Sequence, residues 1–191
     1  MRRAHYFLSR TEVLIMTTYL NFFDYDKAFN YYCEAIAKMR QCTNKDKARI
    51  IAKPALILSI IKLIEEGKSI NRFTYEEIEP VYKSIFGVHF IESKQSNLTP
   101  LHYPYYFLKT DRFWHLTWSN AETRTESPSK AWIENNTKYA TIDPELWILL
   151  SNQKYRQKMI EFILEEKIKK VFKENNKLAF KSLLQLLLVA I

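Results

Sequence analysis

One aromatic stretch, residues 103–116, holds the side chains best suited to bind a ligand. Its sequence is Tyr103-Pro104-Tyr105-Tyr106-Phe107-Leu108-Lys109-Thr110-Asp111-Arg112-Phe113-Trp114-His115-Leu116. Fifty residues earlier, Lys53-Pro54 opens a very apolar segment. Neither segment holds the cluster of carboxylates, cysteines or histidines that acid–base or metal chemistry requires. The pattern instead favours a surface that grips a polymer backbone and places one small group in a pocket lined by rings.

Two elements must position these side chains. The apolar segment predicts a helix from Ala52 to Glu66, because Pro54 suits the first turn, where its missing N–H costs nothing. Tyr105 to Lys109 and Phe113 to Trp118 are predicted as two extended runs joined by a turn at residues 110–112, which makes a β-hairpin.

The rest of the chain is predicted to be mainly helical. Caps and apolar spacing predict further helices over residues 24–41, 74–86 and 129–135, from 143 onward, and over 153–174. Residues 136–142 are interpreted as a link between two helices. The predicted fold class is therefore α+β and mostly α-helical: a helical core with one β-hairpin and C-terminal helices.

A length of 191 residues suits one domain, or one domain with an appendage. The polar, basic segment Thr43 to Lys47 predicts a boundary between an N-terminal helical extension (1–44) and the main domain (45–175). Residues 176–191 are predicted to form an apolar C-terminal helix, in which Leu183 to Ile191 must be covered by the domain or by a partner. Met16 is an alternative start to Met1.

The charge balance favours a polyanionic partner. Twenty-nine lysines and arginines against 21 acidic residues give a net charge of +8, which suits nucleic acid or an anionic membrane, although a solvated lysine surface is the alternative. Only two glycines occur, which argues against a phosphate-cradling loop. Cys33 and Cys42 lack zinc-site spacing, so no metal or cofactor is expected and a reducing cytoplasmic location is favoured. The apolar runs are too short to cross a membrane.

Four segments, taken together in order and spacing, resemble a known family. They are Lys53-Pro54-Ala55-Leu56-Ile57-Leu58-Ser59-Ile60-Ile61, then Tyr103-Pro104-Tyr105-Tyr106-Phe107-Leu108 with Phe113-Trp114-His115-Leu116, then Ser127-Pro128-Ser129-Lys130-Ala131-Trp132-Ile133-Glu134-Asn135, and Tyr139-Ala140-Thr141-Ile142-Asp143. This combination resembles the DNA sulfur-binding domain, which occurs at the N-terminal side of HNH endonucleases of the type IV, McrA-like restriction class. The resemblance spans about Arg49 to Phe172.

In that family the domain recognises phosphorothioate DNA, in which sulfur replaces one non-bridging phosphate oxygen. The resemblance implies a sulfur pocket formed by Tyr103, Pro104 and Phe107. Contacts to the DNA backbone are expected from Lys53, Arg49, His102, Arg112, Ser129 and Lys130. Sulfur is larger, more polarizable and more weakly hydrated than oxygen, so an apolar pocket prefers it.

Three positions depart from some relatives. Ala52 stands where some carry histidine, Lys53 where some carry arginine, and Phe107 where some carry a small side chain. Lysine keeps the charge but lacks the bidentate geometry of arginine, and phenylalanine occupies more of the pocket. These departures leave sulfur selectivity open.

The nuclease half of such proteins has no counterpart here. The four histidines are His5, His89, His102 and His115. None is followed by the HNH arrangement. The chain is therefore expected to be a non-catalytic module that recognises modified DNA in a bacterial restriction or defence system. Its expected partners are double-stranded DNA and a separate nuclease chain.

Two alternatives stay open at this point. The chain could bind DNA without sulfur selectivity, or it could be a helical interaction module. In the second case Leu183 to Ile191 is the working surface, for example a homodimer contact, and the basic charge is incidental. A nuclease with an unrecognised site is the least favoured class, since no residue pattern supports it.

Overall fold

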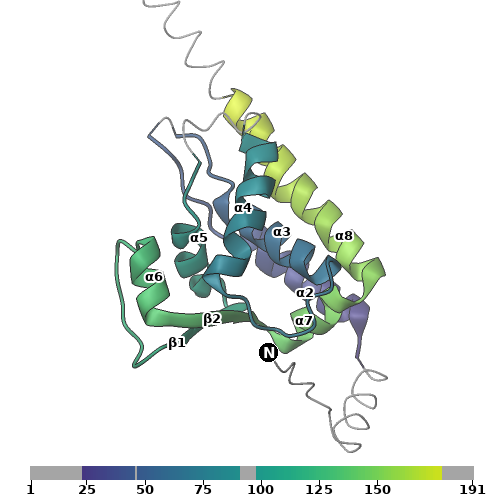
Figure 1. The fold of residues 1–191 in the computed structure, drawn as a ribbon. Helices are drawn as coiled ribbons and strands as arrows, with labels where there is room; N and C mark the ends of the chain where they lie inside the picture. The colour runs from purple at the N-terminus through teal and green to yellow at the C-terminus, as the bar shows by residue number, and fades with distance from the viewer. Residues whose placement is uncertain (1–22, 46, 91–97, 178–191) are drawn as a thin grey trace, which may run out of the picture.

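A computed structural model describes residues 23–45, 47–90 and 98–177. Its helices pack around a central α3, and a small sheet with two short helices covers one side (Figure 1). The elements in chain order are α2 (Tyr25–Lys38), α3 (Ala52–Glu65), α4 (Tyr75–Phe90), α5 (His102–Phe107), the 3-10 helix η1 (Leu108–Asp111), β1 (Trp114–Trp118), α6 (Lys130–Asn136), β2 (Thr137–Ile142), α7 (Pro144–Ser151), α8 (Gln153–Ile163) and the π-helical turn η2 (Leu164–Lys169). The mostly helical α+β class predicted from the sequence is confirmed.

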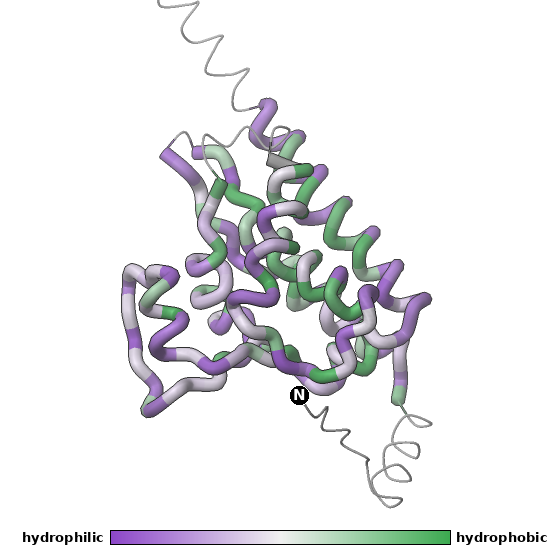
Figure 2. The backbone as a smooth tube through the Cα atoms, viewed as in Figure 1, coloured by the Kyte–Doolittle hydropathy of each residue, from purple (hydrophilic) through white to green (hydrophobic). Residues whose placement is uncertain are grey.

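Helix α3 is central because its side chains are apolar on almost every face. Its buried residues are Ala52, Pro54, Ala55, Leu56, Ile57, Leu58, Ser59, Ile60, Ile61 and Ile64. The hydropathy-coloured backbone shows this helix as a hydrophobic element inside the helical group (Figure 2). Ser59 is the one polar residue among these buried positions of α3. Its hydroxyl donates to the Ala55 carbonyl at 2.7 Å, so the buried oxygen is hydrogen-bonded.

Polar side chains cap the starts of four of the helices. The side chain of Asp24 accepts a hydrogen bond from the Lys27 N–H at 2.9 Å, at the start of α2. Thr74, Ser129 and Asn152 do the same for α4, α6 and α8. Each cap satisfies an N–H that has no partner inside its helix. This local chemistry is why the starts of these helices follow from the sequence.

The predicted β-hairpin is wrong in its first strand. Residues 105–109 lie in α5 and η1 and are helical, not extended. Pro104 occupies the first turn of α5, where a missing N–H is tolerated, and the Tyr105 N–H donates to the Leu101 carbonyl at 2.9 Å. The ring-rich composition favours a strand, but burial of Tyr105 and Tyr106 against the core stabilises the helix.

The second predicted strand exists, with a different partner. β1 pairs antiparallel with β2, with Trp114 opposite Ile142 and Leu116 opposite Ala140. Residues 137–142, interpreted from the sequence as a link, form this partner strand. Ala140 also exchanges two backbone hydrogen bonds of 2.8 Å with Phe73, which adds a single-residue bridge to the sheet.

Helix α2 packs into the same hydrophobic core as the other helices. Tyr32 and Ile36 are buried in it, and the Lys167 ammonium donates to the Ala37 carbonyl at 2.6 Å at the end of α2. Burial lowers the pKa of Lys167. The segment between α2 and α3 closes on itself, since the Ile50 N–H donates to the Cys42 carbonyl at 2.8 Å. The division of the chain after residue 44 stays a prediction.

The apolar C-terminal segment, residues 176–191, lies almost wholly outside the described residues, as does the alternative start at Met16. Within the described ranges, no helix is both long and apolar enough to cross a membrane. The same residues contain no group of three or more histidines, cysteines or acids placed to hold a metal ion.

Candidate functional site

A cavity of about 280 Å³ lies between the N-terminus of α3 and one face of α5. Its walls are almost entirely apolar. The lining residues are Arg40, Gln41, Cys42, Ile50, Ala52, Lys53, Thr99, Tyr103, Pro104 and Phe107. We call it the apolar cavity. It brings the three residues of the expected pocket together with the lysine that opens α3.

Helix α5 is the reason the three pocket residues share one face. At about 100° per residue, Tyr103 and Phe107 are neighbours one turn apart, and Pro104 lies beside them. If residues 103–107 were extended, Pro104 would point away from the other two. Pro104 is buried, whereas Tyr103 is 39% exposed and forms the outer rim. A helical α5 therefore builds a pocket that the predicted hairpin could not.

Lys53 and Arg40 are the two cations among the lining residues of the apolar cavity, and Lys53 is already paired. Its ammonium donates a hydrogen bond to the carboxylate of Asp111, at the end of η1. The two side chains are only 12% and 11% exposed, so the pair is largely shielded from water. Pairing with Asp111 was not expected from the sequence, because 58 residues separate the partners.

The wall opposite α5 comes from the segment between α2 and α3. The Gln41 side chain donates to the Ile50 carbonyl at 3.1 Å, and Ile50 is bonded in turn to Cys42. These bonds hold Gln41, Cys42 and Ile50 against the N-terminus of α3. Sequence reasoning missed this wall because it interpreted the segment as a helix end and a linker.

Of the other expected residues, His102 contacts the rim of the apolar cavity through Tyr103. Its ring centroid is 4.5 Å from that of Tyr103. Burial lowers the pKa of His102, so near neutral pH the ring is uncharged and offers a hydrogen bond, not a charge. Arg49, by contrast, pairs with Glu174 at 3.2 Å, and its side chain is half exposed.

The remaining expected residues lie on other elements. Ser129 caps α6, and Lys130 ties α6 to α4 through Glu79, at 2.8 Å. Arg112 is exposed in the turn between η1 and β1, with a left-handed φ of 65°. These three residues do not line the apolar cavity.

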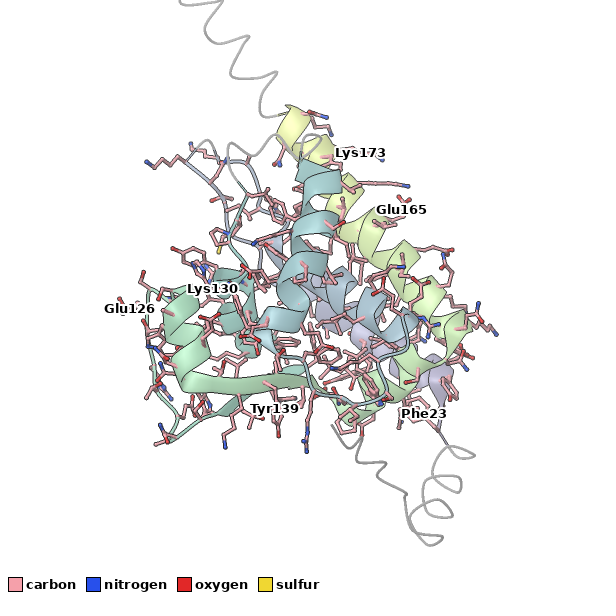
Figure 3. The ribbon with its side chains drawn as sticks, in the orientation of Figure 1. Phe23, Glu126, Lys130, Tyr139, Glu165 and Lys173 are labelled. Atoms are coloured by element: carbon pink, nitrogen blue, oxygen red, sulfur yellow. The ribbon has the colours of Figure 1, made fainter. Side chains whose placement is uncertain are left out.

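Charged side chains also lie on two opposite sides of the molecule. Figure 3 shows Glu126 and Lys130 near α6 on one side, and Glu165 and Lys173 along the C-terminal helix on the other. On that helix Lys169 pairs with Glu165, and Lys170 pairs with Glu166 at 3.2 Å, each with an acid one turn away. Such exposed pairs offer little uncompensated charge to a ligand.

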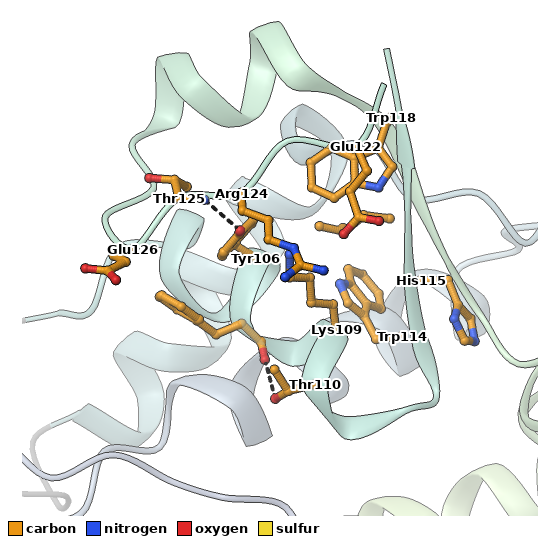
Figure 4. A pocket seen from close by; sticks show the side chains of 12 residues that line it. Tyr106, Lys109, Thr110, Trp114, His115, Trp118, Glu122, Arg124, Thr125 and Glu126 are labelled. Atoms are coloured by element: carbon orange, nitrogen blue, oxygen red, sulfur yellow. Dashed lines mark hydrogen bonds between the residues drawn. The ribbon is translucent and has the colours of Figure 1, made fainter. Parts of the chain in front are cut away.

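A second and larger hollow, about 870 Å³, lies between η1, β1 and the segment that follows β1 (Figure 4). We call it the aromatic groove. Its lining residues are Tyr106, Phe107, Lys109, Thr110, Trp114, His115, Leu116, Trp118, Glu122, Arg124, Thr125 and Glu126. Phe107 lines both hollows, so the two adjoin at this residue.

Lys109, one of the cations of the groove, makes cation–π contacts with two rings. The ammonium of Lys109 lies 4.0 Å from the ring centroid of Tyr106 and 5.2 Å from that of Trp118. The Tyr106 hydroxyl accepts a hydrogen bond from the Thr125 N–H at 3.0 Å and so anchors the opposite wall (Figure 4). Figure 4 shows His115 apart from this cluster. Its Nε2 atom lies 2.6 Å from the Asp143 carboxylate. The groove thus mixes cations, acids and rings.

Comparison with known proteins identifies a fold and no sequence family. No protein family matches the sequence, and no curated protein matches it. Among solved structures, the chain is similar to the sulfur-binding domain of SprMcrA complexed with phosphorothioated DNA. The match has a TM-score of 0.59 and 12% sequence identity, and it covers 78% of this chain and 93% of that one. The resemblance predicted from the sequence is therefore confirmed at the level of the fold.

Proposed function

We propose that this chain is a DNA-binding module that recognises phosphorothioate-modified DNA through the apolar cavity. The observation that carries the proposal is the grouping of Tyr103, Pro104 and Phe107 around one cavity with Lys53 at its edge. The solved structure of similar fold is a domain complexed with phosphorothioated DNA, which supports the same assignment.

The chemistry of the cavity walls supports sulfur over oxygen. A non-bridging phosphate oxygen is strongly hydrated, and burying it against rings and a proline would leave its charge without hydrogen bonds. Sulfur loses less hydration and gains more dispersion contact with Pro104 and the flanking rings. The preference for sulfur therefore arises because the cavity walls offer no hydrogen bonds to replace the hydration of oxygen.

The start of α3 supports binding of the phosphate charge. Lys53 lies in the first turn of this 14-residue helix, whose leading N–H groups have no acceptor within the helix. The N-cap residue, Ile51, has no polar side chain with which to cap them. The helix dipole and the ammonium thus favour an anion at the same edge of the cavity.

The bulk of Phe107 is compatible with a bound sulfur. The cavity keeps about 280 Å³ with the phenylalanine in place. One water occupies about 30 Å³ in the liquid. Sulfur selectivity is therefore proposed to survive the departure at Phe107, and lysine at position 53 to supply charge without bidentate geometry.

We place the module in a bacterial restriction or defence system, as a reader that acts with a separate nuclease chain. Double-stranded DNA is its proposed ligand, and no catalytic step is assigned to its residues. Arg49, His102, Arg112, Ser129 and Lys130 remain proposed contacts to the DNA backbone.

The proposal is tested by competition between two duplexes of identical sequence, one of which carries a single phosphorothioate. We expect a preference of about tenfold or more for the modified duplex, equivalent to about 1.4 kcal/mol. Equal affinity for both would reduce the chain to a DNA binder without sulfur selectivity. Absence of binding to either would favour the helical interaction module, with Leu183 to Ile191 as its surface.

The cysteines allow the site to be located without mutation. Cys42 is exposed and lines the apolar cavity, whereas burial raises the pKa of Cys33 to about 11 and so suppresses its thiolate. An alkylating reagent should modify Cys42 first. The modified duplex should slow that reaction, as read by mass spectrometry of the two cysteine peptides. Unchanged alkylation of Cys42 in a saturated complex would place the DNA elsewhere.

A further inference from the structure

Asp111 is fixed at the end of the element that carries the pocket residues. It is the last residue of η1, which follows α5 without a break. The Phe113 N–H donates to its backbone carbonyl at 2.9 Å, and Arg112 turns the chain away with a left-handed φ of 65°. The position of its carboxylate is thus set by the same backbone that positions Tyr103, Pro104 and Phe107.

Among the ion pairs of the described residues, Lys53–Asp111 is the most buried. Both side chains are nearly nine-tenths covered, whereas the side chains of Lys62 and Glu65, on the last turns of α3, are about half exposed. A shielded pair is weakened less by solvent and salt than an exposed pair. Removing either charge would leave the other poorly compensated.

We propose that Asp111 is an internal competitor for the ammonium that a DNA phosphate would contact, and that it sets the affinity for DNA without setting the preference for sulfur. This inference rests on the proposed function. It assigns to Asp111 a tuning role that is separate from the pocket residues.

The physical basis is an exchange of anions on one cation. A phosphate that reaches Lys53 must either displace the carboxylate or share the ammonium with it. Displacement forfeits an existing pair, and sharing places two like charges within a few ångströms of each other. Both routes lower the gain from contacting Lys53.

The cost is equal for the two kinds of DNA, because ordinary and phosphorothioate linkages each carry one negative charge. Asp111 therefore lowers both affinities by the same factor and leaves their ratio unchanged. Unmodified DNA, which lacks the apolar contact of sulfur, keeps the weaker of the two affinities. Asp111 thus sets how much DNA is bound at a given concentration, whereas the sulfur pocket alone sets how the protein divides between modified and ordinary DNA.

The test is Asp111→Asn, which preserves the shape and the hydrogen-bond acceptor and removes the charge. Affinity for both duplexes should rise by about tenfold, the effect of relieving one close like-charge contact, with the sulfur preference within about twofold of the parent chain. Glu65→Gln is the matched control, because it removes one negative charge beside a lysine of the same helix. It should change both affinities by less than about twofold.

Repeating Asp111→Asn in a Lys53→Ala background shows whether the effect passes through Lys53. There the gain should fall to that of the Glu65→Gln control. A gain that persists in full would overturn the inference. So would an Asp111→Asn variant that binds no tighter than the parent chain.

The unmutated chain gives a second readout if the variant fails to fold. The ¹³C carboxylate resonance of Asp111 should shift during titration with the modified duplex and saturate with it, because the pair to Lys53 is exchanged. An unmoved resonance in a chain that binds with sulfur preference would overturn the inference alone. A parent chain that binds neither duplex would overturn the proposed function and this inference together.

Discussion

The apolar cavity and the aromatic groove adjoin at Phe107, and they differ in how their cations are held. The groove has three times the volume, yet its Lys109 lies against the rings of Tyr106 and Trp118. Lys53 of the cavity is paired with the carboxylate of Asp111. The comparison teaches that the cation of the larger hollow is held by ring packing, whereas the smaller hollow combines an apolar wall with a cation held by an ion pair.

The largest expected effect is a loss of stability from a change in the aromatic groove. Trp114 is 1% exposed, packs against Phe73 and Tyr105, and donates to the Tyr105 carbonyl at 2.8 Å. Trp114→Ala should lower the free energy of unfolding by about 3–5 kcal/mol, since it leaves a cavity and an unpaired carbonyl. Urea denaturation measures this. Trp118→Ala, at a half-buried ring, is the control and should cost clearly less; an equal loss would contradict a structural role confined to the groove floor.

On the cavity side, Tyr103→Ala should change binding and leave the fold intact. The ring is 39% exposed, so the free energy of unfolding should fall by less than about 1 kcal/mol. The preference for the modified duplex should fall by about tenfold, with much of the affinity for ordinary DNA retained. Paired binding curves for the two duplexes measure the ratio. Equal losses for both duplexes would remove Tyr103 from the sulfur pocket.

The charge of the cavity is separated from its apolar wall by Lys53→Ala. This change should weaken binding to both duplexes alike and reduce the slope of log affinity against log salt by about one. Lys62→Ala, at the far end of α3, provides the control and should leave the slope within error. A loss restricted to the modified duplex would show that Lys53 reads sulfur and not phosphate charge.

The smallest expected effect is that of Lys109→Ala in the groove. Losing the cation over the rings of Tyr106 and Trp118 should cost about 0.5–1 kcal/mol of stability. Affinity for DNA should stay within about twofold of the parent chain, because this ammonium is not placed at the proposed phosphate site. A tenfold loss of affinity would extend the binding surface across Phe107 into the groove.

The wrong hairpin and the expected grouping of Tyr103, Pro104 and Phe107 have separate origins. The three consecutive rings at residues 105–107 favour a strand in isolation, and the helix forms because Tyr105 and Tyr106 gain more by packing into the core. The expected pocket residues came from the family resemblance and not from the predicted secondary structure. Their roles stay predictions, although α5 places all three around one cavity.

The sequence by itself determined the features that depend on neighbouring residues: the capped helix starts, the central apolar α3 and the positive balance of charge. Asp24, Thr74, Ser129 and Asn152 each act within three residues of their own position. Only the tertiary structure decided that residues 137–142 form a strand, because the residues of β1 that pair with it lie 19 to 28 positions away in the chain. It also decided the pairing of Lys53 with Asp111, since a contact across 58 residues depends on how α3 and η1 pack and leaves no local pattern in the chain.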